Sequence, residues 1–385
     1  MLKNFTLQTP TKIIFGHGAI GAIKREIPSD SRLMLIYGCN SLKNSGVYER
    51  IKKALEGHKI ISEFSGISAN PEFEYLLKAA EIAKTEKVDY ILAAGGGSVI
   101  DSAKFIAAAA CYDGDPWRIV ESFGACIRSA LPVAAIVTLP ASGSEVNRDA
   151  VISRASKKAK LPMGNPLLYP QFAILDPVLT FTLPKEQTAS GILDTFAHVL
   201  EQYLTTDENA KLQDRFAESI LQTLIEDGPV ALDEPENYEA RSNLMLSSTM
   251  AMNGFLRAGV PMDWSSHMIS HEFTSLLKLS HAQALAIVMP KMMKYCREAK
   301  WQKLLQYAKR VWFIKEGSEA QIIDAVIEKT EAFFQQLGFK TELSDYNIGS
   351  KELEKIVRQL KSHQMIKLGE HRNINPDDLS DIFGA

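Results

Sequence analysis

The side chains best suited to bind a metal ion in this sequence are one aspartate and four histidines. His198 follows Asp194 by four residues, so both side chains share one face of a helix. His267 and His271 are also four residues apart, and His281 follows ten residues later. Carboxylate and imidazole ligands suit Zn²⁺ or Fe²⁺. We expect a divalent metal site on Asp194, His198 and two or three of the other histidines; histidines with purely structural roles are the alternative.

A glycine triplet suggests a second site. Gly95, Gly96, Gly97 and Ser98 follow a buried apolar run and open a helical stretch, where free backbone amides can bind a pyrophosphate. The triplet differs from the G-x-G-x-x-G fingerprint, and a tight turn without a ligand is the alternative. Asp101, one turn later, could accept a hydrogen bond from a sugar hydroxyl or an amide. The alternative is that its negative charge is simply favourable near the positive end of the helix.

Two more polar loops follow apolar runs typical of strands. One spans 138–145 and the other 38–45. Ligands bind at the carboxyl ends of strands in open α/β sheets, so three such loops predict nucleotide binding. The segment 38–45 contains no acidic residue that would repel a 2′-phosphate, and it offers Asn40, Ser41 and Lys43. NADP(H) is therefore favoured over NAD(H); a polar turn without a cofactor role is the alternative.

The elements that must position these residues change character near Pro184. Before it, short apolar runs typical of strands alternate with helical stretches, which predicts an α/β domain with a mostly parallel, dinucleotide-binding sheet. The 12–15 stretch could add an edge hairpin. After Pro184 the strand pattern ends, and apolar residues recur at helical spacing over 189–204, 210–224, 240–256 and 320–337. We predict two domains, an α/β domain at 1–184 and an all-helical, metal-binding domain at 185–385.

Composition narrows the function classes. The chain has 385 residues, 46% hydrophobic and 23% charged, with a net charge of −3, as in an ordinary globular protein. It has no basic stripe for nucleic acid, no apolar run long enough to span a membrane, and no signal-peptide pattern at its start. Its four cysteines form no C-x-x-C pair, so we expect reduced thiols and a cytoplasmic location.

Taken together, these motifs resemble the iron-containing (group III) alcohol dehydrogenase family over essentially the whole chain. The resemblance is strongest to the branch of butanol dehydrogenases and NADPH-dependent broad-specificity aldehyde reductases. It rests on five segments: Pro10–Gly16, Gly95–Asp101, Pro140–Glu145, Gly259–Glu272 and Leu304–Trp312. Ala282 replaces the more widespread glycine after the last ligand histidine, as in this branch, and Ser142 replaces the usual threonine but keeps its hydroxyl.

The resemblance implies roles for individual residues. It makes Asp194, His198, His267 and His281 the metal ligands and His271 a neighbouring histidine that relays protons or supports the site. It places the cofactor on Gly38, Asn40, Gly95, Gly96, Gly97, Ser98, Asp101, Thr138, Ser142, Ser144, Asn147 and Lys160. Asn40 stands where an NADPH reductase of the branch has serine, which weakens the inference of an NADP preference. The resemblance also implies a homodimer.

The expected reaction is metal-dependent hydride transfer between NAD(P)H and an aldehyde or primary alcohol. A glycerol-dehydrogenase-like polyol oxidoreductase is the nearest alternative. A dehydroquinate synthase would need several basic residues around a phosphate, and no such cluster occurs near the expected ligands. A non-catalytic nucleotide- or metal-binding protein is the other alternative, and the intact ligand set Asp194, His198, His267 and His281 argues against it.

Overall fold

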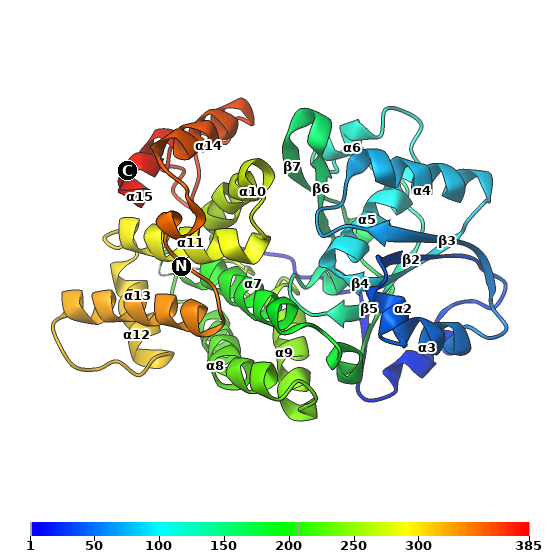
Figure 1. Ribbon diagram of the computed structural model, residues 1–385, viewed down its shortest axis with the longest axis horizontal. Coiled ribbons are helices and arrows are strands. Elements are labelled where there is room, and N and C mark those ends of the chain that lie inside the picture. The colour runs from blue at the N-terminus through cyan, green and yellow to red at the C-terminus, as the bar shows by residue number, and fades with distance from the viewer. Residues whose placement is uncertain (1, 207, 385) are drawn as a thin grey trace. The chain divides into compact units, whose positions relative to one another are not determined.

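The computed structural model describes residues 2–206 and 208–384, which separate into two units (Figure 1). The sheet unit consists of Gln8–Pro184 and Pro235–Asn253. The helical unit consists of residues 2–7, Lys185–Glu234 and 254–384. Neither unit is continuous in sequence, so a single cut of the chain does not separate them.

A six-stranded sheet with all strands parallel forms the centre of the sheet unit, in the order β1-β8-β5-β4-β2-β3. Its strands are β1 (Lys12–Phe15), β2 (Arg32–Gly38), β3 (Lys59–Ile67), β4 (Tyr90–Gly96), β5 (Val133–Leu139) and β8 (Phe172–Leu175). Strands β6 (Asp149–Arg154) and β7 (Ala159–Gly164) form a separate antiparallel pair. The predicted parallel sheet is confirmed. The expected edge hairpin at 12–15 is wrong, because β1 pairs in parallel with β8.

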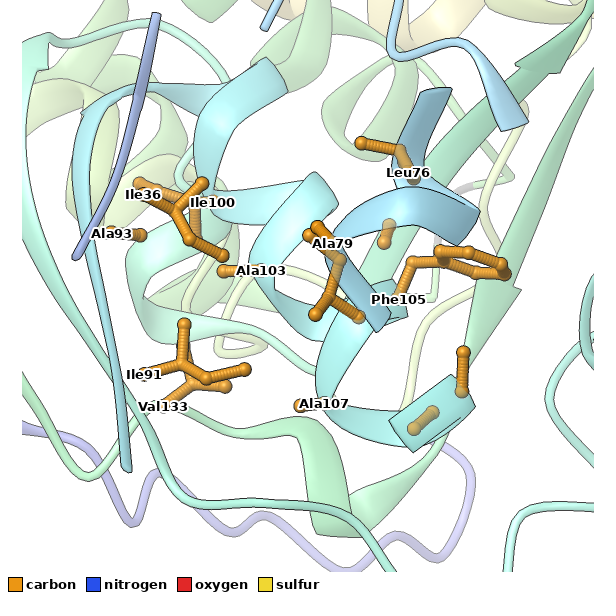
Figure 2. Close-up of a cluster of buried hydrophobic side chains, with 14 of the residues drawn as sticks. Ile36, Leu76, Ala79, Ile91, Ala93, Ile100, Ala103, Phe105, Ala107 and Val133 are labelled. Carbon is orange, nitrogen blue, oxygen red and sulfur yellow. The ribbon is translucent and has the colours of Figure 1, made fainter. Parts of the chain in front are cut away.

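Successive side chains of the central strands point to opposite faces of the sheet, and they are apolar on both faces. Met34 and Ile36 on β2 belong to one apolar cluster, whereas Leu33 and Leu35 belong to another. All four are fully buried, as expected for a parallel strand between two helical layers. Figure 2 shows part of the first cluster, with side chains of α4 and α5 beside those of the strands. The helices of this unit are α1 (Ile23–Glu26), α2 (Ser41–Asn44), α3 (Val47–Ala54), α4 (Phe73–Thr85), α5 (Gly97–Ala110), α6 (Trp117–Glu121) and α9 (Tyr238–Ala251).

Helix α9 lies in a different unit from the one that the sequence-based division at residue 184 assigns to it. That division placed it with 185–385, but its contacts assign it to the sheet unit. Met245 is fully buried in the apolar cluster on one face of the sheet, and Thr249 donates a 2.7 Å hydrogen bond to Glu145. Helical periodicity identifies such an element but not the unit against which it packs. The division into domains 1–184 and 185–385 itself stays a prediction.

The described residues of the helical unit contain helices and no β-strand apart from one isolated bridge. Helices α10 and α11 share an apolar core that includes Ile269, Phe273 and Ile287. A capping box at Ser280 and Gln283 starts α11 and makes His281 its first residue. Of the described helices, none combines the length and apolar character needed to cross a membrane. The helices are α7 (Lys185–Tyr203), α8 (Lys211–Asp233), α10 (Ser265–Leu277), α11 (His281–Tyr295), α12 (Trp301–Arg310), α13 (Glu319–Gln336), α14 (Ser350–Ser362) and α15 (Leu379–Phe383).

Candidate metal centre and cofactor loops

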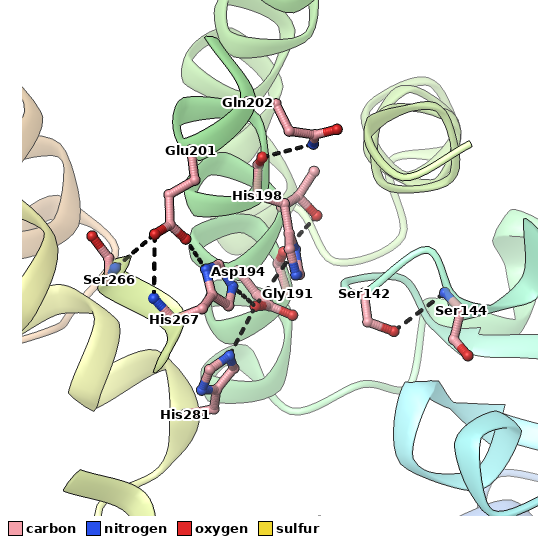
Figure 3. Close-up of polar contacts among 11 residues, drawn as sticks. Ser142, Ser144, Gly191, Asp194, His198, Glu201, Gln202, Ser266, His267 and His281 are labelled. Carbon is pink, nitrogen blue, oxygen red and sulfur yellow. Dashed lines mark hydrogen bonds and ion pairs between the residues drawn. The ribbon is translucent and has the colours of Figure 1, made fainter. Parts of the chain in front are cut away.

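Three helices of the helical unit bring the predicted metal ligands together (Figure 3). Asp194 and His198 are both on α7, with Asp194 Oδ1 3.7 Å from His198 Nδ1. The same oxygen lies 3.7 Å from Nε2 of His267 on α10 and 3.5 Å from Nε2 of His281 on α11. These distances are long for hydrogen bonds. They are close to the separation of about 3.4 Å between ligand atoms that each bind one tetrahedral ion at about 2.1 Å.

The donor atoms of this site are buried without the partners that such atoms normally have. Asp194 Oδ1, His198 Nδ1 and His267 Nε2 make no hydrogen bond within the described part of the chain. Each buried polar atom left without a partner costs about 1–3 kcal/mol. A divalent cation would satisfy all three at once, and one carboxylate with several imidazoles is a donor set that Zn²⁺ and Fe²⁺ accept. The residues present therefore fit a metal ion.

The five candidate residues are not equivalent. One atom each from Asp194, His267 and His281 lie within 4.8 Å of one another, which makes these three the compact group. His198 lies beside the group with its ring stacked on that of His267, at 4.5 Å between centroids. His271 is one turn further along α10, and its ring centroid is 5.3 Å from that of His281. The structure thus groups three of the four expected ligands compactly and places His198 and His271 beside them; the set of four ligands stays a prediction.

Burial and mutual charge shift the ionisation of these groups in opposite directions. Burial lowers the pKa of His198 to about 4, so this imidazole is neutral and available as a ligand at neutral pH. Burial also opposes a charge on His267, but the carboxylates of Glu201 and Asp194 outweigh it and raise its pKa to about 9. For Asp194, burial favours the protonated form, but the neighbouring histidines outweigh it and hold the pKa below its ordinary value.

Glu201 is a functional candidate that the sequence reasoning missed. Its carboxylate accepts hydrogen bonds from Nδ1 of His267 and from the backbone N–H groups of Ser266, at 2.7 Å, and His267, at 3.3 Å. Because a carboxylate only accepts, His267 must carry its proton on Nδ1. The raised pKa of His267 keeps a second proton on Nε2 at neutral pH. A metal ion bound at Nε2 would replace that proton while the Nδ1–H stays on Glu201, which is the tautomer that a metal ligand needs. Glu201 follows Asp194 by seven residues and His198 by three, a helical spacing that could have revealed it.

In the sheet unit, the three predicted cofactor loops follow three adjacent strands. Gly38 ends β2, Gly96 ends β4, and Thr138 is the penultimate residue of β5. Because β4 lies between β2 and β5 and all three are parallel, the loops share one edge of the sheet. The chain moves outward from this point in opposite directions, from β2 to β3 and from β4 to β5, which is where such sheets bind ligands.

The glycines are required by close packing at the start of α5. A Cβ atom on Gly97 would lie 2.1 Å from Ser142 Oγ, and one on Gly95 would lie 2.5 Å from a methyl group of Val99. Gly96 is the N-cap of α5, and no described side chain caps this end of the helix. Its first amides are therefore available to a phosphate, although the packing alone would also explain a tight turn without a ligand.

Several other predicted cofactor residues bond to the protein itself. Both carboxylate oxygens of Asp101 accept hydrogen bonds, from Ser144 Oγ at 2.6 Å and from the backbone N–H of Val151 at 2.8 Å. Asn147 Nδ2 donates to the carbonyl of Gly143 at 3.0 Å. These three predicted residues thus hold one loop together, and direct contact with a cofactor stays a prediction for each of them.

The remaining predicted cofactor residues lie apart from that loop. Ser98 Oγ donates to the carbonyl of Ala69 at 2.6 Å. Asn40 is the N-cap of α2, and Lys160 is on β7, opposite Ser153. Their roles towards a cofactor stay predictions as well.

Comparison with known proteins gives consistent matches along the chain. The model for iron-containing alcohol dehydrogenases matches residues 10–177, and that for the C-terminal part of the Fe-containing alcohol dehydrogenase family matches 188–385. The chain is 48% identical to the NADPH-dependent aldehyde reductase YqhD of Escherichia coli K12, over 100% of both chains. It is 38% identical to the NADH-dependent butanol dehydrogenase A of Clostridium acetobutylicum, over 99% of each.

A solved structure extends these matches to the fold. The crystal structure of YqhD from Escherichia coli K-12 aligns with a TM-score of 0.98 and 48% identity, covering 100% of this chain and 98% of that one. The family models, the sequence identities and the fold agree over both units. The chain is an oxidoreductase that belongs to the iron-containing alcohol dehydrogenase family, in the branch that holds YqhD and the butanol dehydrogenases.

Proposed function

We propose that this protein reduces short aldehydes to primary alcohols in a metal-dependent reaction that consumes NADPH. Membership of the family implies a divalent metal and a nicotinamide cofactor. The observation that carries the proposal is the buried donor set around Asp194 Oδ1, contributed by α7, α10 and α11. In the reaction a hydride passes from the reduced nicotinamide to the carbonyl carbon and a proton passes to the carbonyl oxygen, which gives the alcohol and NADP⁺.

In this proposal Asp194, His198, His267 and His281 hold the metal. A bound Zn²⁺ or Fe²⁺ supplies Lewis-acid polarisation of the substrate carbonyl. Three neutral imidazoles and one carboxylate cancel only one of its two charges, so the donor set preserves an electrophilic site. The distances from Asp194 Oδ1 to the three histidines support this donor set, and both Zn²⁺ and Fe²⁺ accept such ligands.

His271 is proposed to relay the proton through water or the cofactor ribose to solvent. It is buried, 6% exposed, and its ring is close to that of His281, at 5.3 Å between centroids. An imidazole changes its charge near neutral pH, which suits this role. The alternative is that His271 only supports the packing of α10 against α11.

The amides at the start of α5 are proposed to bind the pyrophosphate, and the loop after β2 the adenosine ribose. Two features support NADPH. The segment 38–45 has no acid, and Lys43 Nζ is held over the rings of Tyr37 and Tyr48, at 5.7 and 5.2 Å. The nearby carboxylate of Glu63 accepts hydrogen bonds from both tyrosines and from Lys52. The ammonium of Lys52 offsets the negative charge of this carboxylate. The names of the relatives differ on this point, since one is NADPH-dependent and the other NADH-dependent.

A homodimer and a cytoplasmic location also belong to the proposal. The dimer follows only from the resemblance to the family. The location is supported by four free cysteines, as expected in a reducing compartment.

Kinetics with purified protein test the proposal. NADPH and NADH would each be mixed with a short series of aldehydes, including butanal, while the absorbance of the reduced nicotinamide is followed and bound metal is assayed. We expect oxidation of NADPH to be faster than that of NADH at equal, subsaturating concentrations. A preference for glycerol would favour a polyol oxidoreductase. No oxidation with any aldehyde by metal-loaded protein would favour a binding protein without catalysis.

A further inference from the structure

Lys104 is a fully buried cation on α5 that the proposed reaction does not use. Its side chain lies among apolar residues of the helix and is 0% exposed. Its ammonium donates to Ser144 Oγ at 2.8 Å, to Asn147 Oδ1 at 3.0 Å and to the backbone carbonyl of Asp149 at 2.7 Å. An ammonium has three donors, so all of them are used, and all bond to one short segment.

That segment, 143–151, is the loop that follows β5 together with the start of β6, and Lys104 is the centre of its hydrogen bonds. Asn147 Oδ1, which accepts from Lys104, also accepts from the backbone N–H of Asp149 at 2.9 Å. Ser144 Oγ, another acceptor of Lys104, donates to Asp101. Asp101 and Lys104 are three residues apart, so one face of α5 makes both sets of bonds. Without the ammonium, two side chains and one carbonyl of the loop would lose their shared partner.

The surrounding charges show that this arrangement is costly. The carboxylates that act on the charge of Lys104 are those of Asp101, Asp149 and Glu145. Burial raises the pKa of Asp101 and of Glu145. A buried charged group is weak evidence for stability, because well-packed apolar residues in its place are often equally stable. Fixing a geometry is the better-supported role for such a group, and here the geometry is that of the 143–151 segment.

The same loop packs on the first residue of α5. Ser142 Oγ would lie 2.1 Å from a Cβ atom at Gly97, so the two residues are already at closest approach. The backbone N–H of Ser144 points to Ser142 Oγ at 3.4 Å (Figure 3). A shift of Ser144 would therefore move Ser142 relative to the helix start. Those are the backbone amides and hydroxyls proposed to bind the dinucleotide.

We propose that Lys104 is a positioning residue for dinucleotide binding, because its three hydrogen bonds hold the loop from Ser142 to Asn147 against the amino end of α5. The inference rests on the proposed function, since the cofactor loops belong to that proposal. Lys104 would not touch the cofactor. Its loss should weaken binding by allowing the loop to adopt several positions, so that ordering the loop opposes binding.

The test compares Lys104→Met with wild type and with Lys303→Met. Lys303 is a matched control, because it is also buried, 4% exposed, and bonded to a carboxylate, Asp214 at 2.6 Å, but in the helical unit. NADPH affinity is measured directly, from the fluorescence of the bound reduced nicotinamide, with metal content and melting temperature recorded. We expect Lys104→Met to weaken NADPH binding about tenfold or more. Lys303→Met should lower the melting temperature but stay within about twofold of wild-type affinity.

Kinetics add a readout that a purely structural role would not change. In Lys104→Met the KM for NADPH should rise by a larger factor than kcat falls, with wild-type metal content. If Lys104→Met does not fold, Lys104→Arg is used; it keeps the charge but not the three-point geometry. Wild-type NADPH affinity in whichever of these variants folds would overturn the inference. Failure of the wild-type protein to bind either dinucleotide would instead overturn the proposed function, and the inference with it.

Discussion

His267 donates the hydrogen on its Nδ1 to Glu201 and turns its Nε2 towards Asp194 (Figure 3). Both partners of the hydrogen bond are buried, with side chains 6% and 5% exposed. Glu201 also accepts from the backbone N–H groups of Ser266 and His267, which ties α7 to the first turn of α10. One carboxylate thus sets both the tautomer of a predicted ligand and the placement of the helix that carries it.

Replacing Glu201 by glutamine should weaken metal binding while leaving the fold intact. The amide keeps the shape of the side chain but loses the charge that holds the proton on Nδ1. We expect the affinity for Zn²⁺ to fall about 10- to 100-fold. Competition with a chromophoric chelator measures it. Glu218→Gln is the control, because Glu218 is also buried in the helical unit but accepts from Tyr203. Equal zinc affinities in the two variants would contradict this role of Glu201.

Gly97→Ala should impair both stability and dinucleotide binding. The added Cβ would lie 2.1 Å from Ser142 Oγ, so either the loop or the helix start must move. We expect a loss of about 1–3 kcal/mol in stability, and a smaller rise in melting temperature when NADPH is added than in wild type. Gly21→Ala is the control, because the space around Gly21 is open within 4 Å. An unchanged NADPH-induced shift in Gly97→Ala would show that the triplet does not contact the cofactor.

His363 should titrate above its ordinary range. The hydrogen bond from its Nδ1 to Glu272, 2.7 Å long, joins the end of α14 to α10 and raises the pKa of His363. Because the pKa of His363 is raised by folding, its protonation stabilises the fold fully at pH values below the pKa in the unfolded chain, about 6.5. This stabilisation is lost as the pH rises through the pKa in the folded protein. The melting temperature of wild type should therefore exceed that of His363→Gln by more at about pH 6 than at about pH 9. A difference independent of pH would refute a charged contact.

Much of the fold follows from local patterns in the sequence. Runs such as 33–37 and 90–94 are apolar on both alternating faces, which occurs where helices cover both sides of a parallel sheet. The four helices predicted after Pro184 are present as α7, α8, α9 and α13. The packing partner of α9 could not be predicted, because its apolar face is satisfied equally well by helices or by a sheet. The pairing of β1 with β8 depends on residues about 160 positions apart, which no local pattern records.

The candidate site was predictable where spacing along one helix carries the information. Asp194 and His198 share a face of α7, and the structure places them together. Glu201 follows the same spacing but was missed, because a glutamate in a helix is usually a solvated residue. Lys104 was missed for a similar reason, although a lysine amid the apolar residues of α5 is a signal of burial. The bonds of Asp101 within the protein could not be read from its position alone.

Removal and restoration of the metal test the central claim most directly. Aldehyde-dependent oxidation of NADPH would be measured for the protein as purified, after chelation, after addition of Fe²⁺ or Zn²⁺, and for His267→Ala. We predict that chelation abolishes turnover, that one of the two ions restores it, and that His267→Ala loses bound metal and activity together. Metal-dependent turnover retained in His267→Ala, or full turnover by metal-free protein, would contradict the account.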